Sequence, residues 1–313
     1  MNNMPKTVQE AVSAAPVTYV GGGTDLMPLL KNHVRNDRNL VFLKDIPELK
    51  EIRDEGTHLS IGAGVTLWDV SRHTDICRLL PAAAQAAAAT ASPQIRNIAT
   101  IGGNIMQDRR CIYFNQSLYW RGALPLCFKT GGSVCHQIPN SPVCRAIYYS
   151  DVATALLAYD AEAEYMEDGQ VRTCPLSELI SRHTAANGLA CNRHLPVLVL
   201  RFRVPKPAEG ERSGFHKYAM RSTIDFPLIN FALHCGGNRP AKLVVGAVST
   251  QPVELPETAA LLDSGASDEE VAAACRAELK KLAKPIKEAC ISPAVKRELY
   301  DQVRFLLPLR HPQ

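Results

Sequence analysis

The segment between Asp108 and Ile147 constrains the fold more than any other part of the chain. It lacks a sustained apolar repeat at the period of two or of about 3.6 that marks a strand or a helix. Glycines and prolines interrupt it throughout: Gly122, Pro125, Gly131, Gly132, Pro139 and Pro142. An irregular loop of about 40 residues is uncommon inside a compact domain unless something organises it. Four cysteines in this window are the candidate organiser: Cys111, Cys127, Cys135 and Cys144.

The composition of the 313 residues is that of a soluble globular protein, with 46% hydrophobic and 21% charged residues. A net charge of +4 without a basic block gives no reason to expect nucleic-acid binding. No apolar run approaches the roughly 18–20 residues that span a membrane. Residues 1–16 also lack the continuous apolar stretch of a signal peptide. We therefore expect no membrane contact and a cytoplasmic location.

In a reducing cytoplasm, cysteines are thiols or metal ligands rather than disulfides. Six of the ten cysteines are scattered and are expected to be buried free thiols: Cys77, Cys174, Cys191, Cys235, Cys275 and Cys290. The remaining four are those between Asp108 and Ile147. Their local density calls for a metal centre or another specific role.

Regular structure is expected on both sides of this segment. In the front half we expect strands at 17–20, 41–43 and 59–61 and helices from Thr24 or Asp25, at 68–80 and at 82–91. Beyond the segment we expect a helical stretch at 152–158, a hairpin of 161–166 with 171–174, strands at 195–204, 215–220 and 241–249, and a helix at 271–282 behind the capping box of Ser267 and Glu270. The pattern predicts an α/β domain over residues 1–186, interrupted by an insertion at 108–147, and a smaller α+β unit over 190–313.

Two glycine turns carry the first chemical signal. One is Gly21-Gly22-Gly23-Thr24-Asp25-Leu26, between a strand and a helix, and the other is Thr100-Ile101-Gly102-Gly103-Asn104-Ile105. Glycines let backbone N–H groups approach a pyrophosphate closely. Neither turn fits the G-x-G-x-x-G pattern of NAD-binding Rossmann folds.

These two strings, together with Ile95-Arg96-Asn97 and Ser150-Asp151, resemble the FAD subunits or domains of the xanthine dehydrogenase and carbon monoxide dehydrogenase family. The resemblance runs over nearly the whole chain and implies the PCMH-type FAD-binding fold. It implies that the first turn, including Thr24 and Asp25, wraps the FAD pyrophosphate and that Thr100, Gly103 and Asn104 form the second phosphate turn. Asp151 would then bond the ribityl chain.

The string Phe215-His216-Lys217-Tyr218 also matches the family, with Asp225 and Phe226 continuing the pattern. By this resemblance Lys217 lies near the flavin. The alternative for Lys217 is a solvated lysine on a strand. In this family FAD exchanges electrons with two [2Fe-2S] clusters in a second subunit, which connect to a molybdenum cofactor in a third, so both subunits are the implied partners.

The four cysteines of the insertion follow one another at intervals of 16, 8 and 9. Four thiolates suit either zinc or an iron–sulfur cluster, and the absence of a C-x₂-C knuckle counts mildly against structural zinc. With Tyr119-Trp120-Arg121 and Ser141-Pro142-Val143-Cys144, the spacing resembles flavin subunits of the 4-hydroxybenzoyl-CoA reductase type. That resemblance implies a [4Fe-4S] cluster on Cys111, Cys127, Cys135 and Cys144.

The implied activity is electron relay within a molybdenum-dependent complex, with reductive dehydroxylation of a phenolic aromatic such as 4-hydroxybenzoyl-CoA. One alternative is the FAD subunit of an oxidative, NAD-linked molybdenum hydroxylase. A second, non-enzymatic alternative is a zinc-stabilised scaffold without flavin. The insertion also carries five cations against the single anion Asp108, namely Arg109, Arg110, Arg121, Lys129 and Arg145. We therefore expect an acidic, ferredoxin-like electron donor to dock there.

Overall fold

The computed structural model describes residues 4–12, 17–188, 195–288 and 291–310. Its largest sheet is five-stranded and antiparallel, in the order β3-β4-β7-β5-β6. The strands are β3 (Ile52–Asp54), β4 (His58–Gly62), β5 (Glu162–Glu167), β6 (Gln170–Pro175) and β7 (Leu198–Pro205). The expected hairpin is confirmed as β5 and β6, with Asp168 and Gly169 both at positive φ in its tight turn. A separate parallel pair consists of β1 (Thr18–Val20) and β2 (Leu40–Phe42).

The second large sheet is four-stranded, in the order β11-β10-β9-β8. Its strands are β8 (Glu211–Tyr218), β9 (Ile229–Gly236), β10 (Lys242–Gly246) and β11 (Val253–Glu254). Strand β9 was not among the strands expected from the sequence. It is central and buried at seven consecutive positions, so it lacks the apolar–polar alternation that marks a half-exposed strand.

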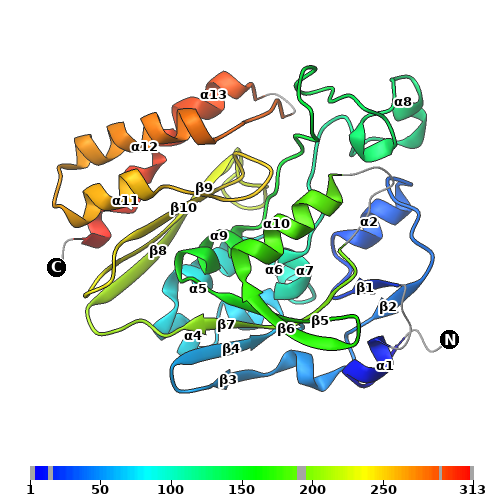
Figure 1. The fold of residues 1–313 in the computed structure, drawn as a ribbon, viewed down its shortest axis with the longest axis horizontal. Helices are drawn as coiled ribbons and strands as arrows, with labels where there is room; N and C mark the ends of the chain where they lie inside the picture. Colours follow the sequence, from blue (N-terminus) through cyan, green and yellow to red (C-terminus); the bar gives the residue numbers. More distant parts are fainter. Residues whose placement is uncertain (1–3, 13–16, 189–194, 289–290, 311–313) are drawn as a thin grey trace.

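Two helices lie between the two larger sheets, α5 (Pro81–Ala89) and α9 (Asp151–Ala158) (Figure 1). Helix α5 contacts β8 and α9, and α9 contacts β9 and β10. Close packing on both sides explains the alanine-rich sequence of α5. The short helices α3 (Leu67–Val70), α4 (Thr74–Leu79), α6 (Pro93–Arg96) and α7 (Ile101–Ile105) and the longer α10 (Leu176–Asn187) complete this layer.

The single helix expected at 68–80 is wrong, because α3 ends at Val70 and α4 starts at Thr74. The Ser71 hydroxyl donates to the Trp68 carbonyl at 2.7 Å, and His73 has extended backbone angles. A serine that bonds the preceding turn competes with continuation of the helix. The other strands, helices and hairpin that the sequence predicted lie within a few residues of their expected positions, whereas α10 was not predicted.

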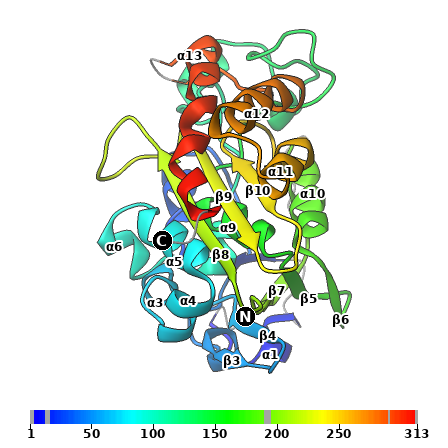
Figure 2. The ribbon, with the colours of Figure 1, turned by 90° about the vertical axis from the view of Figure 1, so that its left-hand side faces the viewer.

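An outer helical layer covers the other face of the four-stranded sheet (Figure 2). It consists of α11 (Pro256–Asp263), α12 (Asp268–Leu282), α13 (Pro293–Glu298) and the 3₁₀ segments at Leu299–Phe305 and Leu307–Arg310. The expected capping box is confirmed, since Ser267 and Glu270 exchange side-chain and backbone hydrogen bonds at the start of α12.

Cys275 is buried in this layer, whereas Cys77, expected to be buried, is exposed. Cys191 and Cys290 lie outside the described residues.

Strand β7 was expected in the C-terminal unit over 190–313, yet it pairs with β4 and β5 of the front half. The chain therefore leaves the first sheet only after Pro205.

The insertion lies at the upper right of Figure 1, beside α2 (Leu26–Lys31), and contains only α8 (Leu118–Gly122) and a 3₁₀ turn at Phe128–Thr130. The remaining elements are α1 (Val8–Val12) and a 3₁₀ turn at Pro47–Lys50. No helix within the described ranges is long and apolar enough to cross a membrane.

The layer between the sheets makes a prediction about stability. Ala87 is fully buried in α5, whereas Ala88 on the same helix is exposed. Replacing Ala87 by Leu should lower the free energy of unfolding by about 1–3 kcal/mol, because a close-packed layer cannot admit the added methylenes without strain. Ala88→Leu should change it by less than about 0.5 kcal/mol. Denaturant unfolding of both variants measures the difference, and equal stabilities would contradict the tight packing of α5.

Candidate functional site

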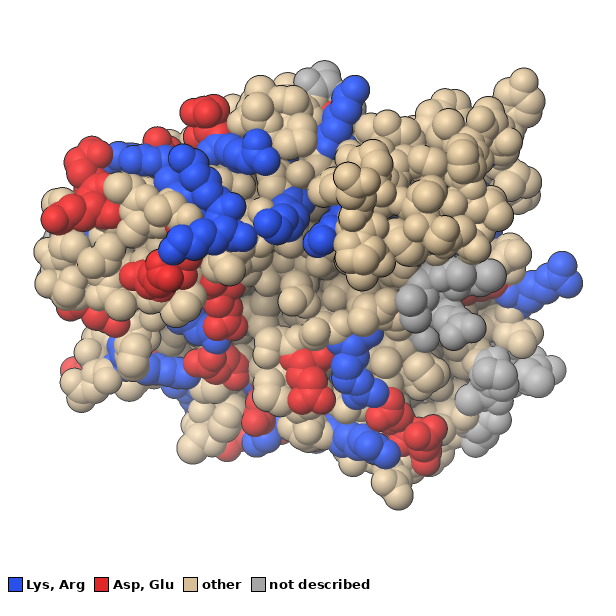
Figure 3. All heavy atoms as spheres, turned by 45° about the horizontal axis from the view of Figure 1, so that its top comes forward, with Lys and Arg blue, Asp and Glu red and all other residues tan. Residues whose placement is uncertain are grey.

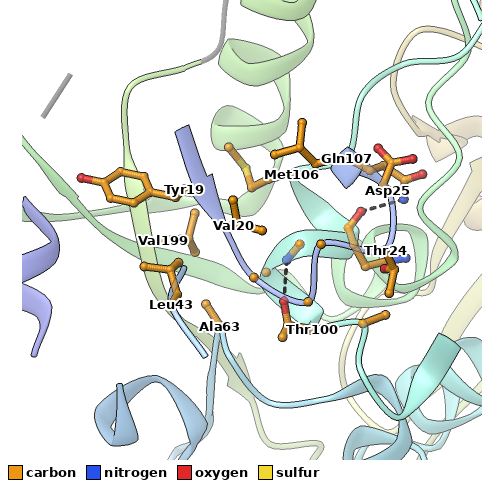
Figure 4. A pocket seen from close by; sticks show the side chains of 18 of the residues that line it. Tyr19, Val20, Thr24, Asp25, Leu43, Ala63, Thr100, Met106, Gln107 and Val199 are labelled. Carbon is orange, nitrogen blue, oxygen red and sulfur yellow. Dashed lines mark hydrogen bonds between the residues drawn. The ribbon is translucent and has the colours of Figure 1, made fainter. Parts of the chain in front are cut away.

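A cavity of about 380 Å³ lies between the two glycine turns and strand β7 (Figure 4). Ten of the twelve residues expected to bind the cofactor line it: Gly21, Gly22, Gly23, Thr24, Asp25, Leu26, Thr100, Gly102, Gly103 and Asn104. The two turns are about 80 residues apart in the sequence. The fold brings them together because β1 ends beside the residues that precede α7.

The first turn packs directly on the backbone before the second. A Cβ atom added to Gly22 would overlap the carbonyl of Ile98, and one added to Gly21 would overlap the Thr100 hydroxyl. Gly102 is equally confined against Ala63. These glycines are therefore needed for the contact between chain segments, in addition to any contact with a ligand.

The turn also presents backbone donors to the cavity. Gly23 has a φ of 70°, a left-handed conformation that favours glycine. Among the hydrogen bonds of the described chain, none uses the N–H groups of Gly22, Gly23 or Thr24. Successive unpaired N–H groups in a turn form a concave site for an anion. Their position at the cavity wall fits a phosphate or diphosphate.

Gly103 plays a different part from the confined glycines. Its N–H donates to the Thr100 hydroxyl at 3.1 Å, which caps the start of α7 (Figure 4). A Cβ at Gly103 would meet only that hydroxyl, at 3.0 Å, and would otherwise project into open space. The missing side chain thus leaves room at the cavity wall for a ligand.

The opposite end of the cavity is apolar. Tyr19 and Val20 of β1, Leu43, Ala63 and Val199 of β7 face it from different elements (Figure 4). A predominantly apolar wall suits a planar aromatic group such as an adenine ring. The cavity therefore combines an aromatic-ring compartment with an anion-binding turn, as a dinucleotide requires.

Asp151 and Lys217 do not line the cavity. The Asp151 carboxylate is 2% exposed and accepts hydrogen bonds from Lys217 at 2.8 Å and from Asn230 at 2.6 Å. Burial raises its pKa despite the neighbouring ammonium. Its link to the cavity is Thr90, a lining residue whose hydroxyl lies 3.4 Å away. A contact of Asp151 with a ribityl chain stays a prediction.

The alternative of a solvated Lys217 is wrong, because its side chain is only 10% exposed and also donates to the Ala89 carbonyl at 2.9 Å. Phe226 does line the cavity, as its place in the sequence pattern suggested. Asp225 pairs with Arg221 at 3.1 Å instead.

The Asp25 side chain has an unexpected partner. Its carboxylate accepts from Arg110 at 2.8 Å and from the backbone N–H of Asp108 at 3.4 Å. Both partners belong to the start of the insertion. The carboxylate of the first turn therefore holds the insertion, while the backbone of the same turn faces the cavity.

The insertion is anchored at its root and along its length. Arg110 and Ile147 exchange backbone hydrogen bonds at 2.8 and 2.9 Å and close the loop. The Gln137 side chain pairs with the backbone of Lys287 at 2.8 and 3.0 Å. Phe114 is buried against Leu29 of α2. The insertion thus packs on the helix that follows the first glycine turn.

Two cations are buried beneath the insertion. Lys129 is 2% exposed and donates to the Arg109 carbonyl at 2.8 Å and to the Asn187 amide oxygen at 3.0 Å. Arg109 is 3% exposed and donates to the Cys144 carbonyl at 3.2 Å, while its Nε has no acceptor within the described chain. Asp108, the buried anion beside them, also pairs with Arg35 at 3.3 Å. Positive charge is therefore in excess at this site.

Two of the four cysteines of the insertion lie near this charge: Cys144 near both cations and Cys135 near Arg109. Cys111 interacts electrostatically with Cys144, and Arg109 with both Cys144 and Cys135. Cys127 lies in the electrostatic range of Arg121. Burial raises the pKa of the Cys111 thiol. Within the described part of the chain, no three His, Cys, Asp or Glu side chains converge closely enough to hold a single metal ion.

Asn187 was missed by the sequence analysis, although it donates to Asp108 and accepts from the Arg109 N–H at 2.9 Å. It ends α10 and is almost 80 residues from these partners. No local pattern signals such a residue. Gln107 and His183, which also line the cavity, were missed for the same reason.

The structure gives no support to the expected basic docking face. Arg109 and Lys129 are buried, Arg110 pairs with Asp25, Arg121 donates to the His33 carbonyl and Arg145 donates to Ser141. In Figure 3 the upper right of the molecule, where the insertion lies, shows few charged atoms. Its exposed side chains are instead largely apolar, with Tyr119 94% exposed: Leu118, Tyr119, Trp120, Leu126, Val134 and Val143. The charge count therefore gives no support to an acidic donor.

The cavity geometry predicts a strong effect at Gly103. Gly103→Val should push a branched side chain into the space beside the turn and reduce FAD binding at least about 100-fold, since a clash at a diphosphate cannot relax. Gly122→Val is a matched control, because Gly122 lies on the exposed helix α8 with no atom near an added Cβ. Flavin content after anaerobic purification measures both. Full flavin content in Gly103→Val would show that this turn does not hold the diphosphate.

Comparison with known proteins also indicates a FAD-binding chain. Residues 3–207, more than half of the chain, match the family described as the FAD binding domain in molybdopterin dehydrogenase. The chain is 29% identical over 239 residues to the xanthine dehydrogenase FAD-binding subunit of Escherichia coli O157:H7, covering 75% of this chain and 68% of the relative. It is 28% identical over 258 residues to the aldehyde oxidoreductase FAD-binding subunit of Escherichia coli K12, covering 79% and 80%.

Among solved structures, carbon monoxide dehydrogenase from Hydrogenophaga pseudoflava lacking the Mo-pyranopterin moiety superimposes with a TM-score of 0.72 at 21% identity, covering 96% of this chain and 93% of that chain. Quinoline 2-oxidoreductase from Pseudomonas putida 86 gives 0.71 at 20% identity, with 98% and 94% covered. These likenesses show the PCMH-type fold. With the matched region, they identify the chain as a FAD-binding member of the xanthine dehydrogenase and carbon monoxide dehydrogenase family of molybdopterin dehydrogenases.

Proposed function

We propose that this chain is an electron-transfer subunit that carries FAD between its glycine turns and a [4Fe-4S] cluster on Cys111, Cys127, Cys135 and Cys144. The observation that carries the cluster is the excess of buried positive charge on Arg109 and Lys129 beneath these cysteines. The chain would work within a molybdenum-dependent oxidoreductase complex, as the names of its relatives suggest.

The residues around the cavity fit FAD. The unpaired N–H groups of Gly22, Gly23 and Thr24 and the open space at Gly103 would hold the diphosphate. The apolar compartment that contains Tyr19 and Val199 would take the adenine. Phe226 and Thr90 line the cavity and place Lys217 and Asp151 behind its wall, where they would orient the remaining part of the cofactor.

The donor set of the insertion fits an anionic iron–sulfur cluster. Asp108 is the buried anion beside Arg109 and Lys129, and burial lowers the pKa of both cations, so a further negative partner would stabilise their charged forms. Four thiolates around an iron–sulfur core would supply it. Zinc requires four thiolates about 4 Å apart around one ion, and the cysteines do not converge in this way.

Bound together, FAD and the cluster would supply storage and transfer of electrons between a one-electron carrier and the molybdenum subunit through a [2Fe-2S] subunit. The protein residues position these groups and exclude water from the root of the insertion, where Phe114 and Lys129 are buried. The insertion's resemblance to 4-hydroxybenzoyl-CoA reductase supports reductive removal of a phenolic hydroxyl as the reaction of the complex. The competing proposal is an oxidative, NAD-linked hydroxylase.

Metal content tests the proposal directly. Anaerobically purified chain should contain about four irons and one FAD. Cys135→Ser should lose the iron, because Cys135 is buried within the insertion, whereas Cys77→Ser should keep it, because Cys77 is an exposed thiol outside the insertion. Iron analysis and electron paramagnetic resonance after reduction measure both. Zinc in place of iron, or unchanged iron in Cys135→Ser, would refute the cluster.

The identity of the electron donor distinguishes reductive dehydroxylation from oxidative, NAD-linked hydroxylation. A reduced low-potential one-electron carrier should reduce the flavin faster than NADH does. Because Arg109 and Lys129 are buried and Arg110 is paired with Asp25, raising the salt concentration from 0.05 to 0.5 M should change that rate by less than about threefold. Stopped-flow absorbance measures both rates. Faster reduction by NADH would favour the oxidative, NAD-linked function, and a steep salt dependence would restore electrostatic docking.

A further inference from the structure

We propose that Arg110 is a positioning residue that couples the two cofactor sites, so that the state of the cysteine insertion sets the affinity for FAD. The inference rests on the proposed function, because it concerns the same flavin and cluster. It assigns to Arg110 a role that the cofactor-binding pattern in the sequence does not contain.

Arg110 touches both sites. Its guanidinium pairs with Asp25 of the flavin turn at 2.8 Å and lies 4.8 Å from the ring centroid of Phe226, which lines the cavity. Its backbone pairs with Ile147 and closes the root of the insertion. The next residue along the chain is Cys111. One arginine therefore joins a proposed cluster ligand to two parts of the flavin cavity.

A second connection runs in parallel beside Arg110. The N–H of Asp108 donates to the other Asp25 oxygen at 3.4 Å, and the Asp108 carboxylate pairs with Arg35, which lines the cavity. Asn187 ties Asp108 to the buried Lys129. A shift at the root of the insertion therefore reaches the first glycine turn through the Asp25 carboxylate.

The physical reason for coupling is charge. With the cluster present, the buried cations Arg109 and Lys129 would face a second anion besides Asp108, and the root would be held closed. Without it, Asp108 alone would oppose the two cations, and the insertion should open more readily to hydrate them. Arg110 and Asp108 would then release Asp25, and the turn would lose the conformation that presents its N–H groups. By thermodynamic linkage, FAD must in turn strengthen cluster retention by the same factor.

The size of the coupling is modest. The side chains of Arg110 and Asp25 are 25% and 30% exposed, so solvent screens their attraction. We expect about a fivefold effect on the FAD dissociation constant, at the low end of measured couplings between sites.

A four-variant cycle on the full-length chain tests this. The FAD dissociation constant is measured by calorimetry, after flavin removal, for the starting chain, Cys135→Ser, Arg110→Gln and the double variant. Cys135→Ser should weaken FAD binding about fivefold when Arg110 is present and less than about twofold when it is Gln. Arg110→Lys should restore part of the coupling, because it keeps the charge beside Asp25.

Arg145→Gln is the matched control, since Arg145 follows Cys144 as Arg110 precedes Cys111 but donates to Ser141 within the insertion. It should leave the full fivefold effect in place. If Arg110→Gln does not fold, Asp25→Asn breaks the same ion pair and should also abolish the coupling. Equal effects of Cys135→Ser with and without Arg110, or no effect, would overturn this inference alone. A chain that binds flavin but no iron would overturn the proposed function as well.

Discussion

The contact between the first glycine turn and the backbone at Ile98 is the constraint on which the rest of the site depends. Gly22 lies so close to the Ile98 carbonyl that a Cβ atom has no room. This contact fixes β1 and α7 relative to each other and leaves the cavity between them. Glycine thus serves two needs at adjacent positions. At Gly21 and Gly22 it allows two chain segments to meet, at Gly23 it permits the left-handed conformation, and at Gly103 it leaves the cavity wall open to a ligand.

The insertion is built on a second constraint, the burial of Arg109 and Lys129. Carbonyl and amide acceptors satisfy part of their hydrogen-bonding capacity, yet these groups do not neutralise the charge. Asp108 is the buried anion beside these cations, and the four cysteines of the proposed cluster belong to the same irregular segment. The number of basic residues in the insertion is as counted from the sequence, but the inference that they form an exposed docking face is not supported by the structure. Arg109 faces Cys135 and Cys144, whereas Arg110 pairs with Asp25 and Arg121 donates to the His33 carbonyl.

The sequence predicted the fold where patterns are local. The first glycine turn, the β5–β6 hairpin and the Ser267 capping box each depend on neighbouring residues, and all three have the expected structure. The second glycine string, expected as a turn, forms the short helix α7 instead. Strand β9 was missed because a strand buried on both faces has no alternation. Asn187 and the Asp25–Arg110 pair could not be predicted, because their partners are about 80 residues away and are brought together only by packing.

The residues around the cavity also divide into two groups by their position. Residues named by the family pattern divide into those that form the cavity wall and those, such as Asp151 and Lys217, that form an ion pair behind it. A buried pair of this kind contributes little net stability, since desolvation offsets the attraction, but removing one partner is costly. The ion pair between Asp151 and Lys217 therefore matters for the positions of the elements it joins rather than for net stability. It fixes the start of α9 against β8 and so holds Thr90 at the wall, just as Arg110 holds Asp25 on the other side. The cavity is shaped from behind by two ion pairs, the buried pair of Asp151 with Lys217 and the pair of Asp25 with Arg110 at the root of the insertion.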